Sequence, residues 1–366
     1  MRIVNMRGNK PNQDDLYSYI SLEDRVPISH PLRPMREIID DVLKSMSKKF
    51  DKLYAKTGRP SIPPEVLVKT LFLQILYGIR SERLVLEQLD FNLLYRWFVG
   101  ITMNQKIWDE TVFTKNRDRL FAGEALDAFF SEVITEADKR GLLSHDHFSV
   151  DGTLIESWAS LKSFKSKENS DKNNDDGDPG NPSVDFHGEK RRNDTHQSTT
   201  DSQAKLYRKG KGKEARLYYM GHLLMENRNG LAVAASTTAA GYHEERKSAL
   251  QMLKSLKHKG RITMAGDKHY DDHEFVRNLK SIAVTPHVAQ NIHSRRHHSA
   301  IDNRTTRHSG YEVSQRKRKR IEEIFGWAKG FSTLRRPHFR GLKRIGAFFK
   351  FVISAYNLMR IRNLCY

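Results

Sequence analysis

The chain has almost no cysteine and no long hydrophobic run. Cys365 is the only cysteine among 366 residues, which excludes a disulfide framework and a cysteine-rich zinc site. No stretch approaches the roughly 20 apolar residues of a membrane-spanning helix, and no apolar signal segment follows Met1. We therefore expect a soluble cytoplasmic protein without a membrane partner.

Acidic residues are clearly outnumbered by basic ones. The chain has 63 Lys and Arg against 44 Asp and Glu, a net charge of +19. Because much of this excess is clustered, it predicts a polyanionic partner, with DNA first and an anionic membrane second. The length exceeds that of an average domain, so we expect two or three structural units.

Helical periodicity dominates residues 1–140, which we predict to form an all-helical N-terminal domain. Helices are expected at 35–50, 62–78, 82–90, 92–99, 111–121 and 124–140, with Ser61 as the cap of the second. Short helices that carry cations are compatible with two alternatives, a helix-turn-helix that binds DNA or a plain helical bundle with charged outer faces. The cations in question are Arg80, Arg83, Arg96, Lys115, Arg117 and Arg119.

The character of the sequence changes near His145. Strands are predicted at 148–155, 217–226, 231–239, 261–267 and 282–288, with helices at 244–257, 271–280 and 341–364. This order predicts a mixed sheet with helices on its faces, of the α/β class, over residues 141–366. A polar stretch at about 165–213 reads as an inserted loop.

The segment 316–329 combines dense positive charge with two neighbouring acids. Five consecutive cations precede Glu322 and Glu323, and the apolar spacing predicts a helix. Arg318, Glu322 and Lys329 then share one helical face, whereas Glu323 points about 100° away. The alternative is an exposed helix with salt bridges.

Three carboxylates stand in matching contexts. Asp151 lies on a predicted strand, Asp267 ends a later strand, and Glu322 lies on a helix after the last strand. Phosphodiester cleavage by two divalent ions about 3.5–4 Å apart needs carboxylates that converge from separate elements. Hard oxygen ligands select Mg²⁺ or Mn²⁺ over zinc. We therefore predict that these three residues are catalytic and hold two such ions.

Three motifs carry a resemblance to a known family. They are Ser149-Val-Asp151-Gly-Thr153, Gly266-Asp267-Lys268-x-Tyr270-Asp271, and a third in which Arg318, Glu322 and Lys329 follow the family's spacing, with Gln315 at its Tyr position. The chain resembles bacterial insertion-sequence transposases of the DDE class, specifically the insertion sequence five family of the RNase H-like superfamily. Residues 58–61 and 108–113 also resemble the helical domain of these enzymes.

The resemblance implies an RNase H-like catalytic core behind a helical DNA-binding domain. It implies an enzyme that binds terminal inverted repeats, cuts DNA by metal-dependent hydrolysis and joins the 3′-hydroxyl ends to target DNA. Bringing two ends together implies a homodimer on double-stranded DNA, in the bacterial nucleoid. The alternatives are a stand-alone RNase H-like endonuclease and a non-catalytic DNA-binding regulator derived from a transposase.

Basic residues near the third motif are expected to bind DNA phosphates, with strong salt dependence. We assign this role to Lys268, Arg316, Lys317, Arg318, Lys319, Arg320, Lys329, Arg335, Arg336 and Arg340. Trp158 and Trp327 are expected either to stack on unpaired bases or to pack in the core. The histidines at 293, 297 and 298 admit a zinc site or a cationic loop.

Overall fold

The first half of the chain folds into short helices. The computed structural model describes residue 19 and residues 21–54, 57, 61–122, 124–167, 191–208, 210, 213–256, 258, 260–292 and 298–366. Its first helices are α1 (Leu22–Arg25), α2 (Leu32–Ser45), α3 (Ser47–Asp51), α4 (Pro64–Leu76), α5 (Glu82–Phe91), α6 (Leu93–Val99), α7 (Glu110–Ala122) and α8 (Ala125–Lys139). The pattern over 35–50, predicted as one helix, divides at Met46 into α2 and α3.

The start of α4 differs from its prediction. The N-cap is Pro63, which offers no side-chain cap, and Pro64 is the first helical residue. Proline is tolerated there because the first helical N–H has no partner within the helix. The Ser61 hydroxyl instead donates to Oδ1 of Asn116 on α7, at 2.5 Å. The predicted Ser61 cap is therefore wrong.

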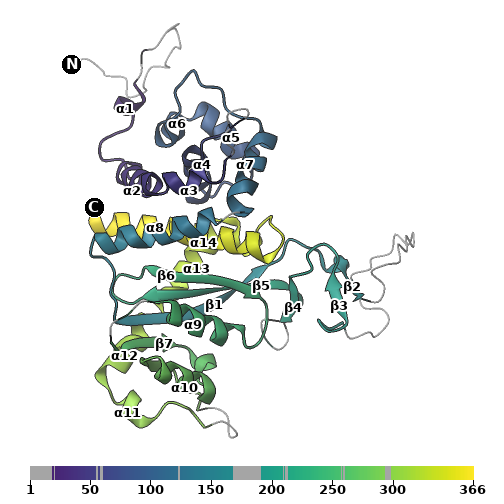
Figure 1. Cartoon of the computed structure of the whole chain (residues 1–366), viewed down its shortest axis with the longest axis vertical. Coiled ribbons are helices and arrows are strands. Elements are labelled where there is room, and N and C mark those ends of the chain that lie inside the picture. Colours follow the sequence, from purple (N-terminus) through teal and green to yellow (C-terminus); the bar gives the residue numbers. More distant parts are fainter. Residues whose placement is uncertain are drawn as a thin grey trace, which may run out of the picture.

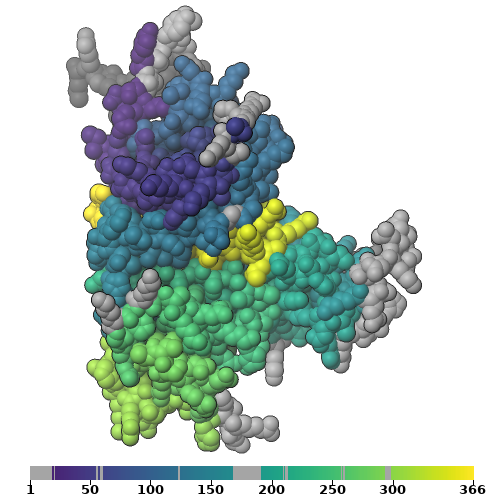
Figure 2. Space-filling model, in the orientation of Figure 1, coloured from purple at the N-terminus to yellow at the C-terminus, as the bar shows by residue number. Residues whose placement is uncertain are grey.

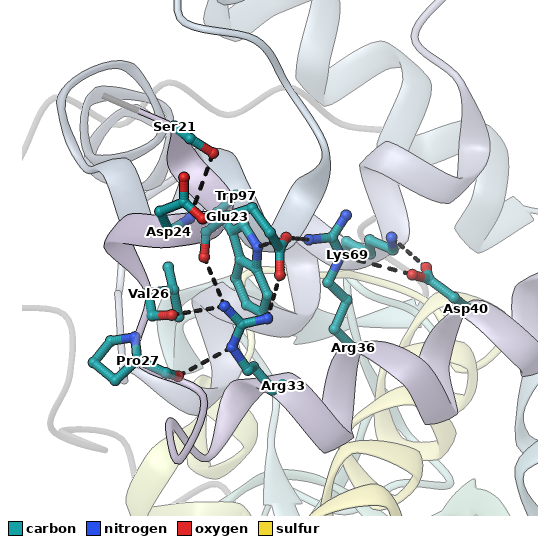
Figure 3. A network of polar contacts seen from close by, with 10 residues as sticks. All are labelled: Ser21, Glu23, Asp24, Val26, Pro27, Arg33, Arg36, Asp40, Lys69 and Trp97. Atoms are coloured by element: carbon teal, nitrogen blue, oxygen red, sulfur yellow. Dashed lines mark hydrogen bonds and ion pairs between the residues drawn. The ribbon is translucent and has the colours of Figure 1, made fainter. Parts of the chain in front are cut away.

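A polar network fixes α1 onto the other helices (Figure 3). Glu23 accepts a hydrogen bond from the indole N–H of Trp97 at 2.6 Å and pairs with Arg33. The guanidinium groups of Arg33 and Arg36 lie 5.1 and 4.6 Å from the centre of the Trp97 ring, within cation–π range. Behind them the buried Lys69 pairs with a carboxylate of α2. Part of the positive charge therefore stabilises the fold.

The cations that suggested a helix-turn-helix fall into two groups. Arg96 is 3% exposed and donates to Oδ1 of Asp90 at 2.7 Å. Arg117 pairs with Glu82 and lies 5.1 Å from the centre of the Phe339 ring. These two side chains are held within the protein. The exposed members of the set, in contrast, are Arg80, Arg83, Lys115 and Arg119.

A mixed sheet forms the centre of the second half. Its strands lie in the order β4-β5-β1-β7-β8, and β6 pairs with β5. They are β1 (His147–Glu156), β4 (Lys205–Arg208), β5 (Ala215–Glu226), β6 (Ala232–Ala239), β7 (Ile262–Gly266) and β8 (Val284–Val288). β1 runs antiparallel to β5 and parallel to β7. The predicted mixed α/β class is confirmed.

The polar stretch at 165–213 is only partly a loop, and its residues 168–190 lie outside the described part. β2 (Phe164–Ser166) pairs with β3 (His196–Ser198), and β4 joins the main sheet beside β5. Asp201 ties this region to the body of the protein, because it accepts hydrogen bonds from Ser157 and from Tyr219. The expectation of a loop throughout is wrong here, since β3 and β4 are too short and polar to give a strand pattern.

Helices cover both faces of the sheet (Figure 1). α9 (Glu244–Ser255) packs on the face that carries Phe148 and Val150, whereas the opposite face, with Ile155 and Leu223, packs against α13 and α14. The remaining elements are α10 (His273–Ser281), α11 (Asn303–Thr306), α12 (Ser309–Lys317), α13 (Arg320–Phe331), α14 (Leu342–Cys365), η1 (Leu161–Ser163), η3 (Lys268–Tyr270) and η4 (Thr333–Arg335).

The two halves of the chain share a core. α14 packs against both β6 and α8, and its buried Phe351 contacts Phe129 of α8 with ring centres 5.7 Å apart. Figure 2 shows the N-terminal helices seated directly on the second half. The division at residue 140 stays a prediction. None of the helices in the described ranges has the length and apolar character needed to cross a membrane.

Candidate active site

Strands β1 and β7 part at one end of their pairing, and the strand edge left there is called the crevice below. The parallel pairing of these strands ends at Ser149 and Ala265, and β7 itself ends at Gly266. β1 continues past this point, so Asp151 lies on an edge that β7 no longer covers. Asp267 directly follows β7. Ligands bind at such crevices beside strand ends in open α/β sheets.

Asp151 is held in an environment that favours its protonated form. Burial, together with the charges of Asp267 and Glu245, raises the pKa of this carboxyl from 3.8 to about 7. The Gly152 N–H, which donates to Oδ1 at 2.8 Å, and the nearby Arg318 act in the opposite direction. Carboxylates that destabilise each other in this way are typical of functional sites.

Asp267 caps the short helix η3. Its Oδ1 accepts a hydrogen bond from the His269 backbone N–H at 2.9 Å, and its Oδ2 lies 3.0 Å from Nδ1 of the same residue. The capping bond fixes the carboxylate at the end of β7. Tyr270 is buried against Gly266, where a Cβ would lie 3.1 Å from the ring. The predicted motif thus places Asp267 beside Asp151.

Glu245 is a third carboxylate at the crevice, and the sequence did not single it out. It lies in the first turn of α9. Its pKa is raised by burial and by the charge of Asp267. A Cβ placed on Gly152 would lie 2.7 Å from Oε1 of Glu245. No motif marked this residue, because a second acid at a helix start is an ordinary feature of a sequence.

Glu322 occupies the first turn of α13 and is exposed. The helix predicted over 316–329 is interrupted, since α12 ends at Lys317 and α13 begins at Arg320. The junction is a tightened turn in which the Glu322 N–H donates to the Lys319 carbonyl at 3.1 Å. α13 packs beside β1, yet in the described residues Glu322 makes no hydrogen bond or ion pair with either aspartate.

Arg318 is held in place by a chain of polar contacts. Its Nε donates to Oε1 of Gln315 at 2.9 Å, and the Gln315 amide donates to the His287 carbonyl on β8. Gln315, which stands at the family's Tyr position, therefore orients Arg318 and links α12 to the sheet. The effect of Arg318 on the pKa of Asp151 places its charge near that carboxylate.

The predicted DNA-binding cations are spread over several surfaces. Arg320 is tied down, because its Nη1 donates to the Arg228 carbonyl at 3.2 Å. Lys317, Arg318 and Lys329 are half-buried. The exposed members of the set are Lys268, Arg316, Lys319, Arg335, Arg336 and Arg340.

A cavity of about 820 Å³ lies between the N-terminal helices and the sheet half. Its wall includes Ile75, Phe121 and Phe348, and its charged lining includes Arg80 on one side and Arg335 on the other. The acids in its lining are largely engaged. Glu82 pairs with Arg117, and Glu156 pairs with Arg216 and Arg336.

The two singled-out tryptophans differ. Trp327 packs in the core, with its ring centre 5.7 Å from that of Tyr356. Trp158 is 40% exposed, and its ring centre lies 4.1 Å from that of the tilted His338 ring and 5.0 Å from the guanidinium of Arg336. Core packing is therefore found for Trp327, and base stacking stays a prediction for Trp158.

The zinc alternative gains no support from the described residues. The histidines at 293 and 297 lie outside them, and His298 accepts a hydrogen bond from His273 through its carbonyl. Within the described ranges no three His, Cys, Asp or Glu side chains are close enough together to enclose an ion. The crevice carboxylates nonetheless offer the hard oxygen donors that Mg²⁺ and Mn²⁺ prefer.

Carboxylates at a strand end, with an arginine near them and exposed cations around, fit an enzyme that acts on nucleic acid. A model of the transposase DDE domain matches residues 185–358, and a model of a transposase domain (DUF772) matches residues 20–119. The chain belongs to the DDE transposases. The first match contains Asp267 and Glu322, whereas Asp151 lies between the two matched regions.

Two solved structures have a limited likeness to the chain. A cryo-EM structure of the piggyBac transposase synaptic complex with hairpin DNA is 10% identical, with a TM-score of 0.39, and the alignment covers 93% of this chain and 80% of that chain. The crystal structure of the Mos1 strand transfer complex is 9% identical, with a TM-score of 0.24, and the alignment covers 93% and 97%. A comparison with curated proteins found no match.

Proposed function

We propose that this DDE transposase binds the terminal inverted repeats of an insertion sequence, cleaves DNA there and joins the freed 3′-hydroxyl ends to target DNA. We place it in the insertion sequence five family, on the spacing of Arg318, Glu322 and Lys329. The observation that carries the proposal is the meeting of Asp151 and Asp267 at the crevice, where the pKa of Asp151 rises to about 7.

Asp151, Asp267 and Glu322 would hold two Mg²⁺ or Mn²⁺ ions. Such ions supply an activated water and stabilise negative charge on the leaving oxygen. The chain's own contribution is to fix the carboxylates, through the Gly152 N–H on Asp151 and the His269 N–H on Asp267. Glu322 would complete the set from α13 when DNA fills the crevice.

Arg318 is suited to hold the phosphate that is cut. Its charge opposes the rise in the pKa of Asp151, and Gln315 fixes its orientation. A guanidinium in this place would neutralise charge on the phosphate and position it beside the carboxylates. Exposed Lys268 and Arg316 would contact neighbouring phosphates.

The DNA would run from the crevice toward the cavity between the two halves of the chain. Glu156, in the cavity lining, stands five residues beyond Asp151 on β1, which corresponds to about 17 Å along a strand. Arg80, Arg335 and Arg336 would then contact the backbone, with Trp158 placed to stack on an unpaired base. Double-stranded DNA of the element ends and of the target would be the partner.

Two such chains would act together. Joining both ends of an element to one target requires two active sites held on one DNA complex, so we propose a homodimer on DNA. We further propose that the enzyme works in the bacterial cytoplasm, at the nucleoid.

A strand-transfer assay tests the proposal. Purified protein would be mixed with Mg²⁺, a duplex that carries the inverted repeat flanking the gene, and a supercoiled plasmid. We expect plasmid products joined to the repeat, and their loss with Asp151→Asn, Asp267→Asn and Glu322→Gln. Cleavage without joining would instead identify an endonuclease. Unchanged cleavage in all three variants would refute the assignment of the site.

A further inference from the structure

Glu245 makes no ion pair within the described residues, although two cations follow it on α9. Arg246 pairs with Asp272 at 2.6 Å, and Lys247 pairs with Glu244 at 3.3 Å. Each nearby cation is therefore engaged by another acid. A salt bridge that merely stabilises the start of α9 does not account for the position of Glu245.

The side chain of Glu245 is directed at β1. A Cβ on Gly152 would lie 2.7, 3.1 and 3.2 Å from its Oε1, Cγ and Cδ atoms. The 2.7 Å contact is shorter than real Cβ contacts, so with a larger residue at position 152 the Glu245 side chain would have to shift. Gly152 shares the α9 face of the sheet with Val150, because side chains alternate along a strand.

Asp151 and Glu245 thus approach the crevice from opposite faces of the sheet. Asp151 precedes Gly152 and pairs in register with Leu223, whose side chain packs on the face of α13 and α14. β7 has left β1 before this point. The bare edge at Gly152 therefore lets a carboxylate from the α9 face approach Asp151 and Asp267.

The negative charges of these three carboxylates are opposed by few positive charges. The charges of Asp267 and Glu245 both raise the pKa of Asp151, and Asp267 also raises that of Glu245. The cations that oppose these effects are Arg318, Arg246 and His269. Like charges held together in a partly buried crevice are costly, and a bound divalent cation would relieve that cost.

We propose that Glu245 is a fourth carboxylate of the metal centre, which binds a divalent ion from the α9 face while Glu322 approaches from the α13 face. The inference rests on the proposed function, since it assumes that Asp151 and Asp267 hold such ions. Its new content is that the ion-binding set extends across the sheet through the gap at Gly152. Glu244, one residue earlier, is engaged with Lys247 and takes no part.

Direct binding of Mn²⁺ tests this without reliance on catalysis. The full chain and its Glu245→Gln variant would be titrated with Mn²⁺, and free ion would be followed by electron paramagnetic resonance. Glu244→Gln is the matched control, and circular dichroism would verify that each variant is folded. We expect Glu245→Gln to weaken at least one Mn²⁺ site by at least about 10-fold, and Glu244→Gln to bind as the unmodified chain does.

The Asp151→Asn variant distinguishes a failure of this inference from a failure of the proposed function. If it weakens Mn²⁺ binding and Glu245→Gln does not, this inference fails while the proposed function stands. If neither variant changes binding, both fail. A Glu245→Asp variant that restores part of the affinity would support a ligand role over a packing role, since it keeps the carboxylate and shortens the side chain.

Discussion

The helices α9 and α13 make an instructive pair, because each brings a glutamate toward the same strand. On α13, Glu322 has the family's spacing to Arg318 and Lys329, yet it is exposed and makes no polar contact with the aspartates in the described structure. On α9, Glu245 belongs to no motif, yet it lies against Gly152 and acts on the pKa of Asp151. Sequence spacing identified the first glutamate, and only proximity in space identified the second.

The largest expected effect is that of a substitution at Glu322. We expect Glu322→Gln to reduce DNA cleavage by more than about 100-fold, since residues that merely support ligands already cost 10–100-fold. Glu323→Gln, beside it on the same helix, is the control and should cleave within a few-fold of the unmodified enzyme. A single-turnover cleavage assay measures both. Equal loss in the two variants would mean that the first turn of α13 acts through its structure and not through one carboxylate.

The next prediction concerns the α9 face of the sheet, where Glu245 lies against Gly152. We expect Gly152→Ala to displace the Glu245 carboxylate and raise the Mg²⁺ concentration needed for half-maximal cleavage by about 10–100-fold. Gly326→Ala on α13 is the control, because a Cβ there would meet no atom within 4 Å. In the double variant with Glu245→Gln, the two effects should not add, since both act on the same carboxylate. Additive effects would show that the glycine matters for another reason.

The pKa of Asp151 predicts how metal binding depends on pH. Below its pKa of about 7 the carboxyl is protonated, and an ion must displace that proton to bind. We therefore expect apparent Mn²⁺ affinity to rise by up to about 10-fold per pH unit toward pH 7 and to level off above it. Asp151→Asn should remove this part of the dependence. Calorimetric titrations at several pH values would measure it, and a profile unchanged by the substitution would contradict the assignment.

The sequence predicted most elements of the sheet half because their signals are local. The strand around Asp151, the hairpin of β5 and β6, and the strand before Asp267 each carry an apolar pattern and lie where expected. Strand β4 was not predicted, since it has only four residues and depends on β5 for pairing. The interruption of the cationic helix at Arg318 was also missed, because nothing in that run disfavours a helix.

Site residues could be predicted from the sequence only where they lie in a recognisable motif. Asp151 and Asp267 sit in such motifs, and their meeting at the crevice follows from the parallel pairing of β1 and β7. Glu245 is far from both in sequence, and its role depends on how α9 lies across the sheet. A missing side chain at Gly152 was the available sequence signal, but a glycine after an aspartate is also typical of a turn.

The smallest expected effect concerns the cations around α13 and η4, where dense charge alone cannot tell a DNA contact from an internal salt bridge. Arg335 is exposed in the cavity lining, whereas Arg216 contacts both Glu156 and Glu214. Each phosphate contact contributes about 0.9 to the slope of log affinity against log salt concentration. We expect Arg335→Ala to lower that slope by about 0.9 and Arg216→Ala to leave it unchanged, as measured by fluorescence anisotropy with end DNA. Equal slopes for the two variants would place the DNA elsewhere and leave the cavity as a structural gap between the halves of the chain.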